Sequence, residues 1–190
     1  MTEETGIGNL GDIPDLSGVV DESSPEPFAD GWYQGTIIAK REFTDQNGND
    51  RVFASEDVPS QNGESRNINL QLELKRKDGR VLNTRALVNY RTEDLTQETI
   101  QAVKQAQASA KESGENLGAM FRPFMVLTQL GTLQRIAGVR QLQRNGNGGL
   151  DLAPLYGKTI FVRLGDDDRN PKFKAVKKFQ ETAPKKATVL

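Results

Sequence analysis

Residues 66–74 alternate between polar and apolar side chains over their whole length. The apolar positions are Ile68, Leu70, Leu72 and Leu74. Successive Cβ atoms of a strand point to opposite faces of a sheet, so this alternation predicts a half-buried strand. Residues 77–80 (Lys-Asp-Gly-Arg) predict a turn, and residues 81–90 predict a second strand that completes a β-hairpin.

Residues 31–44 predict a first strand, because Tyr33, Gly35 and Ile37 fall on one of its faces. The polar run 45–50 predicts a turn, and residues 51–55 a short extended return. Residues 56–65 contain Pro59, Gly63 and several polar side chains, and we expect a loop there.

Residues 92–147 predict a helical insertion. Thr92–Leu95 has the acids of a helix start, and residues 95–113 carry a narrow apolar stripe that Ser113-Gly114 ends. Pro123 interrupts a second apolar stretch, 117–130, and so predicts a kink or an end before a last helical piece at 132–142. Residues 145–149 predict a flexible linker.

Residues 158–164 and 172–179 predict a closing hairpin around a turn at 165–171. Three strands, a helical segment and two strands follow the order of a five-stranded OB-like barrel, an α+β, mostly β fold. The helical insertion, about 92–147, falls between strands 3 and 4. We therefore expect an acidic flexible arm at 1–30, an OB-like domain at 31–180 and a tail at 181–190.

The chain of 190 residues contains no Cys and no His. This composition excludes Cys or His zinc sites, a Cys nucleophile and histidine acid–base catalysis. We therefore expect no enzyme activity, no catalytic residues, no metal and no cofactor. The sequence also shows no run of about 20 apolar residues that could span a membrane and no basic leader, which predicts a cytoplasmic protein.

Three motif-like runs have simpler explanations. Gly6–Gly11 matches GxGxxG but lacks the strand before it that a dinucleotide site requires. Residues 45–56 resemble a calcium loop, yet Asp50 stands where the loop needs glycine, which favours a hairpin turn. Residues 166–168 (Asp-Asp-Asp) lie between strands beside Arg169 and predict a solvated turn.

Charge is unevenly distributed along the chain. Residues 1–30 hold eight of the 26 acidic residues and no Lys or Arg, so the remainder has a net charge of +7. This asymmetry favours a polyanion-binding body with an acidic arm, or equally a solubilising tail on an ordinary domain.

Aromatic and basic residues on the predicted strands form the candidate binding set. Proteins that bind single strands combine a positive groove with aromatic faces for base stacking. The candidate stackers and phosphate partners are Trp32 or Tyr33, Lys40, Arg41, Phe43, Arg51, Phe53, Arg85, Phe161, Arg163, Lys172 and Lys174. The alternative for each is a core aromatic or a lysine that protects a sheet edge. We expect Phe161 to point outward beside Arg163, and Phe173 and Phe179 to lie in the core.

Four segments carry a resemblance to a known family. They are Gly31–Ile37 (GWYQGTI), residues 66–74, Leu133–Gly138 (LQRIAG), and Leu155–Leu164 (LYGKTIFVRL) running into 172–179. Over about residues 31–180 the chain resembles phage-encoded OB-fold proteins that bind single-stranded DNA. The resemblance implies a role in DNA replication or recombination.

One feature departs from this family. Many of its members carry an acidic C-terminal tail that recruits replication partners, whereas this chain ends in Lys185-Lys186-Ala187-Thr188-Val189-Leu190 and has its acids at the N-terminus. The recruiting arm is either at the other end or absent.

These observations predict sequence-tolerant binding of single-stranded DNA. The expected partners are that DNA and replication or recombination proteins bound through the acidic arm, with a homo-oligomer left open. The alternative is a phage structural or host-interaction protein without nucleic-acid affinity. A carboxylate nuclease ranks last, because the acids lie in turns and in the arm rather than clustered at strand ends.

Overall fold

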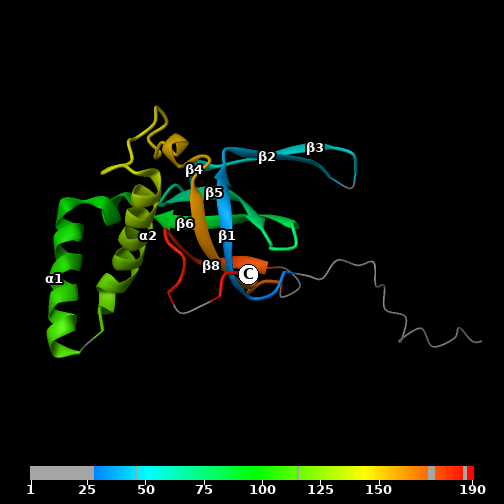
Figure 1. Cartoon of the computed structure of the whole chain (residues 1–190). Coiled ribbons are helices and arrows are strands. Elements are labelled where there is room, and N and C mark those ends of the chain that lie inside the picture. The colour runs from blue at the N-terminus through cyan, green and yellow to red at the C-terminus, as the bar shows by residue number, and fades with distance from the viewer. Residues whose placement is uncertain (1–27, 46, 115, 171–173, 186–187) are drawn as a thin grey trace, which may run out of the picture.

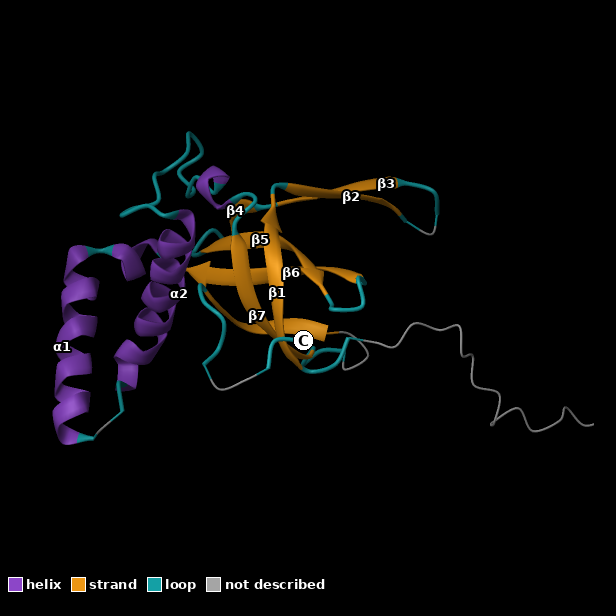
Figure 2. Cartoon of the chain, in the orientation of Figure 1, coloured by secondary structure: helices purple, strands orange, loops and turns teal. Residues whose placement is uncertain are grey.

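The computed structural model of the chain describes residues 28–45, 47–114, 116–170, 174–185 and 188–190. The fold is α+β and consists mostly of strands (Figure 2). The strands are β1 (Gly31–Ile38), β2 (Lys40–Thr44), β3 (Asp50–Ala54), β4 (Glu56–Pro59), β5 (Arg66–Lys75), β6 (Val81–Tyr90), β7 (Thr159–Asp166) and β8 (Lys174–Gln180). The helical elements are η1 (Thr92–Leu95), α1 (Gln97–Ser113), η2 (Gly118–Met120), α2 (Phe121–Ala137) and η3 (Ala153–Leu155).

Six strands form one antiparallel sheet in the order β4-β5-β1-β7-β8, with β6 paired to β5. The predicted hairpin is confirmed as β5 and β6, and its register runs from Arg66 opposite Tyr90 to Lys75 opposite Val81. Ile68, Leu70, Leu72 and Leu74 are fully buried. Each such side chain contributes about 1.5–3 kcal/mol through burial, which explains why the alternation predicted this hairpin correctly.

The sheet is open rather than a closed barrel. β6 and β8 approach each other, but no ladder pairs them among the described residues. The predicted first strand divides near Ala39. Its first part, β1, joins the main sheet, and its second part, β2, pairs with β3 in a separate hairpin that projects from the body (Figure 1). The helical segment lies between β6 and β7, as expected.

The prediction of a loop at 56–65 is wrong for its first four residues. Residues 56–59 form β4, which pairs with the beginning of β5. Asp57 is buried because its carboxylate accepts hydrogen bonds from Arg66 Nε (2.9 Å), Tyr90 Oη (2.5 Å) and Leu150 N (2.6 Å). Because these distant residues satisfy the buried carboxylate, a segment with a polar sequence can form a strand.

The last of these bonds also corrects the flexible linker expected at 145–149. That segment is an ordered turn in which Asn145 N donates to the Gly149 carbonyl oxygen, and Arg144 and Leu150 form a bridge. Gly149 is required there, because a Cβ atom would lie 2.5 Å from Arg66 Nη2 and 2.7 Å from the Asp57 carbonyl oxygen.

The helices pack at one end of the sheet, on the side away from the β2–β3 hairpin (Figure 1). Thr96 caps α1 by accepting a hydrogen bond from Thr99 N, and Gly114 ends the helix in a left-handed conformation. The predicted break at Pro123 is wrong. α2 runs unbroken from Phe121 to Ala137, because Pro123 lies in its first turn, where a helix has no use for the missing N–H. The buried face of α2 joins the hydrophobic core.

Candidate nucleic-acid interface

A groove of about 740 Å³ lies between the β2–β3 hairpin, the β5–β6 strands and the β7–β8 turn. We call it the basic groove. Its lining carries five cationic side chains and two carboxylates. The cations are Arg41, Arg85, Arg169, Lys174 and Lys177, and the carboxylates belong to Asp167 and Asp168. Phe53 and Leu87 add exposed apolar surface. The groove therefore combines excess positive charge with an accessible aromatic ring.

The hairpin wall of the groove is an aromatic and arginine cluster. In the β2–β3 register Arg41 is opposite Phe53, and Phe43 is opposite Arg51, so all four side chains share one face. The two phenyl rings stack with centroids 5.4 Å apart and planes at 14°. Phe43 is 38% exposed and Phe53 is 43% exposed. Two large aromatic rings at this exposure are available to a ligand.

Arg41 holds this cluster against the sheet. Its guanidinium carbon lies 5.0 Å from the Phe43 ring centroid and 5.4 Å from that of Phe53. Its Nη1 lies 3.4 Å from the Asn83 carbonyl oxygen on β6, at the limit of a hydrogen bond. Its Nε is inaccessible and has no hydrogen-bond partner among the described residues. The cation therefore joins the hairpin to the sheet while remaining close to the groove.

The tip of the hairpin is the polar turn that the sequence predicts. The Asp45 carboxylate accepts hydrogen bonds from the backbone N–H groups of Asn47 (2.9 Å) and Asn49 (3.0 Å) and from Arg51 Nε (3.1 Å). The bond from Asn49 is the largest of the effects that lower the pKa of Asp45. A turn that uses its carboxylate in this way is not arranged as a calcium loop, and no cluster of metal-ligating side chains occurs among the described residues.

Arg85 and Gln71 face each other across the floor of the groove. Gln71 is buried, with its backbone N–H donating to Ser55 Oγ at 2.8 Å. Arg85 is exposed, and its guanidinium has no hydrogen-bond or ion-pair partner in the described part of the chain. An exposed arginine without a carboxylate partner is free to bind an anion from solution.

The β7–β8 turn forms the opposite wall, where cations are already paired. Lys174 Nζ lies 2.5 Å from Asp30 and 2.6 Å from Asp166, and the bond to Asp166 is the main cause of the raised pKa of Lys174. Lys177 Nζ lies 2.6 Å from Asp168. The turn expected at 166–168 is present, and Lys174 and Lys177 supply its ion pairs. Arg85 is therefore more available to a phosphate than Lys174.

Three candidate residues lie on a different surface. Trp32, Phe161 and Arg163 are on the outer face of β1 and β7, away from the core. The prediction that Phe161 points outward beside Arg163 is confirmed. Phe179 is buried in the core, as expected.

One candidate is corrected by the structure, a second lies apart from the groove, and a third falls outside the described residues. Tyr33 is 1% exposed, and its hydroxyl donates to the Ala29 carbonyl oxygen at 2.9 Å, so it is a core residue and cannot stack on a base. Lys40 occupies the other face of the hairpin, paired with Glu42 at 2.6 Å. Lys172, like Phe173 beside it, lies outside the described residues.

The basic groove also contains residues that the sequence did not indicate. Arg169 lines the groove from the β7–β8 turn. Lys177 lines it as the extra residue of a bulge in the β7–β8 pairing, between Arg163 and Leu164. Leu87 is 53% exposed on the polar face of β6. A leucine among polar residues on that strand face was the feature of the sequence that could have indicated its role.

The chain matches no protein-family model, no curated protein and no solved structure. Within the described residues no helix has the length and apolar character needed to cross a membrane.

Proposed function

We propose that the protein binds single-stranded DNA in the basic groove without strong sequence preference. The observation that carries this proposal is the position of Phe53 and Arg85, which has no partner among the described residues, in one groove with an excess of positive charge. Base stacking contributes about 1–3 kcal/mol per base at such sites, and cations that contact phosphates add a salt-dependent term. The groove offers aromatic surface for bases on one wall and cations for the backbone on its floor.

The topology of the sheet supports an OB-type relationship. β1 lies between β5 and β7, while β6 extends the sheet beyond β5 and β8 extends it beyond β7. Since every pairing is antiparallel, β6 and β8 both run parallel to β1. These are the two strands whose pairing would close a five-stranded barrel. We propose that the fold is an OB variant opened at this seam, with β2–β4 inserted between its first two strands.

The position of the basic groove fits this relationship. OB folds bind oligonucleotides on the face of their second and third strands, between the loop joining strands 1 and 2 and the loop joining strands 4 and 5. The corresponding elements are the β5–β6 face, the β2–β3 hairpin and the β7–β8 turn, and all three line the groove. The resemblance to phage proteins extends the proposal to a role in DNA replication or recombination.

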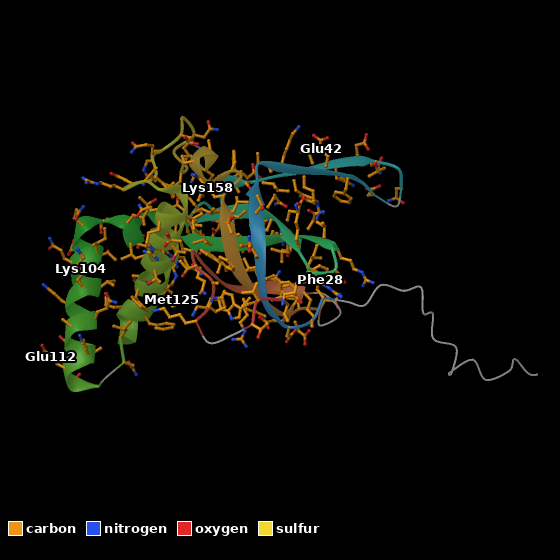
Figure 3. The ribbon with its side chains drawn as sticks, in the orientation of Figure 1. Phe28, Glu42, Lys104, Glu112, Met125 and Lys158 are labelled. Atoms are coloured by element: carbon orange, nitrogen blue, oxygen red, sulfur yellow. The ribbon has the colours of Figure 1, made fainter. Side chains whose placement is uncertain are left out.

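Charge reversal at Arg85 tests this proposal. A labelled oligothymidine of about 6 nucleotides is titrated by fluorescence anisotropy into the wild type, Arg85→Glu and Lys104→Glu. Lys104 lies on α1, across the molecule from the hairpin that carries Glu42 (Figure 3), so the control makes the same charge change at a distance. We expect Arg85→Glu to weaken binding roughly ten-fold or more, since it replaces a phosphate partner by a like charge. Equal effects of the two variants, or no binding by the wild type, would contradict the proposal.

A further inference from the structure

The outer face of β1, β7 and β8 carries a second aromatic and basic surface. We call Trp32, Phe161, Arg163 and Lys178 the outer patch. The strand registers place Trp32 opposite Arg163 and Arg163 opposite Lys178, in one row across three strands. Phe161 occupies the adjacent row, between Gln34 and Gln180. Cross-strand neighbours on one face lie about 4.5–5.5 Å apart at their Cβ atoms, so these side chains form a continuous surface.

The two aromatic residues of the outer patch are not explained by the core. Both are only partly buried, and neither belongs to the hydrophobic cluster that includes their strand neighbours Tyr33 and Val162. Their rings lie on the face of the sheet that the core does not use. A tryptophan and a phenylalanine in adjacent rows of such a face suit a planar ligand, because base–aromatic stacking does not depend on the identity of the base.

The cations of the outer patch have no counter-ion among the described residues. Arg163 and Lys178 are exposed, and neither forms a hydrogen bond through its side chain or an ion pair within the described residues. No carboxylate occupies the six positions of the two rows, which otherwise hold glutamines. This contrasts with the nearby β7–β8 turn, where lysines are paired with aspartates. The surface is therefore complementary to a polyanion.

β8 connects the outer patch to the basic groove. Lys177 is the bulged residue of the β7–β8 pairing and lines the groove, whereas Lys178, the next residue, lies in the outer row. A bulge changes the direction of successive side chains, so consecutive lysines serve both surfaces. Cations thus continue around the strand at this edge of the sheet.

We propose that the outer patch binds the continuation of the DNA strand that occupies the basic groove. The strand leaves the groove beside Lys177, crosses β8 at Lys178 and stacks bases on Phe161 and Trp32, with Arg163 bound to phosphate. This inference rests on the proposed function. It adds that the binding path has two segments, and that only an oligonucleotide longer than the groove reaches the second one.

Length dependence tests the inference. Oligothymidines of about 6 and about 15 nucleotides span the range of site sizes known for OB folds. We expect the double variant Arg163→Glu/Lys178→Glu to weaken binding of the longer strand roughly ten-fold or more and to leave the shorter one unchanged. The matched control is Lys104→Glu/Lys111→Glu, two exposed lysines on α1. Phe161→Ala, which alters no charge, should weaken binding of the longer strand alone.

The outcomes separate this inference from the proposed function. If the outer-patch variants leave the longer strand unaffected, or weaken both lengths equally, the two-segment path is wrong while groove binding stands. If the wild type binds neither length, the proposed function fails and the inference fails with it. Circular dichroism of each variant confirms that the substitutions leave the fold intact.

Discussion

The guanidinium of Arg41 lies over the ring of Phe53, its partner across the β2–β3 ladder, with 5.4 Å between the guanidinium carbon and the ring centroid. This contact positions the ring at the groove while much of it stays exposed. A ring held in place loses little conformational freedom when it binds a base, which suits a stacking platform.

Phe53→Ala should therefore weaken binding of single-stranded DNA by about 1–3 kcal/mol, the value of one stacked base. Phe53→Trp should retain affinity, because it preserves an aromatic face. Val52→Ala is the control, since Val52 is 60% exposed and alternates with Phe53 to the other face of the hairpin. Anisotropy titration at one fixed salt concentration measures all three variants. A loss with Val52→Ala as large as that with Phe53→Ala would refute the stacking role.

The two candidate cations Arg85 and Lys40 should differ in salt dependence. Arg85, at the floor of the groove, has no ion-pair partner in the described part of the chain, whereas Lys40 is paired with Glu42 on the other face of the hairpin. Removing one phosphate contact lowers the slope of log K against log salt by about 0.7 for a single strand. We expect this decrease for Arg85→Ala and an unchanged slope for Lys40→Ala, both measured at several salt concentrations. The opposite pattern would place the DNA on the other face of the hairpin.

Gly149 should be essential for stability. A Cβ atom there would lie 2.7 Å from the Asp57 carbonyl oxygen and 2.5 Å from Arg66 Nη2, which itself donates to that oxygen. Neither atom can move without breaking this contact, so Gly149→Ala should cost roughly 1–3 kcal/mol of unfolding free energy. Gly146→Ala, in the same turn, is the matched control because no atom lies within 4 Å of its added Cβ. Urea denaturation compares the two variants, and equal midpoints would disprove the close approach.

Tyr90 should make the fold sensitive to alkali. Burial, followed by the hydrogen bond to the Asp57 carboxylate and its charge, raises the pKa of Tyr90 above its usual 10.0. A pKa that is higher in the folded than in the unfolded state contributes stability below the unfolded pKa and loses it as pH rises. The wild type should thus lose about 1.4 kcal/mol more than Tyr90→Phe between about pH 8 and about pH 11.

Urea denaturation at the two pH values measures this difference, and the comparison with Tyr90→Phe is needed because burial also raises the pKa values of Tyr33 and Tyr156. Tyr90→Phe should itself cost roughly 1–3 kcal/mol at neutral pH, since it leaves a buried carboxylate with one hydrogen bond fewer. Parallel losses in wild type and variant would show that Tyr90 does not titrate in this range.

The acidic arm should compete with DNA for the cations of the groove. Its last acid, Asp30, pairs with the groove residue Lys174 at 2.5 Å, and seven further acids lie in residues 1–27, outside the described residues. Deleting residues 1–29 should tighten DNA binding at low salt and have little effect at high salt, where charges are screened. A full-length chain with those seven acids changed to Asn or Gln is the control, because it removes the charge of the arm without shortening the chain. Unchanged affinity after deletion would exclude the competition.

The sequence could predict those elements whose pattern is local. The alternation in 66–74 and the turn at 77–80 identified the central hairpin, and side-chain parity placed Phe161 outward. β4 was missed because burial of Asp57 depends on Leu150, 93 residues away, and no local pattern encodes that contact. The break predicted at Pro123 failed because η2 moves the start of α2 to Phe121, which leaves the proline in the first turn.

The candidate site divides in the same way. Arg41, Phe43, Arg51 and Phe53 share a hairpin face, as a period of two implies. Their meeting with Arg85 and with the β7–β8 turn depends on tertiary packing, as does the separation of Trp32 and Phe161 onto the outer face. Trp32 and Tyr33 lie on opposite faces of β1, and the sequence did not decide which of these faces is buried. Tyr33 was therefore kept as a candidate stacking residue although it lies in the core.

Binding of single-stranded DNA is measured by titrating the full chain into a labelled single strand of about 15 nucleotides at several salt concentrations and following anisotropy, with duplex of equal length as competitor. We expect binding that resists the duplex and a log K that falls linearly with log salt, with a slope whose magnitude divided by about 0.7 gives the number of phosphates engaged. Absence of binding at low salt, or equal competition by duplex, would contradict it and favour an interaction protein without nucleic-acid affinity.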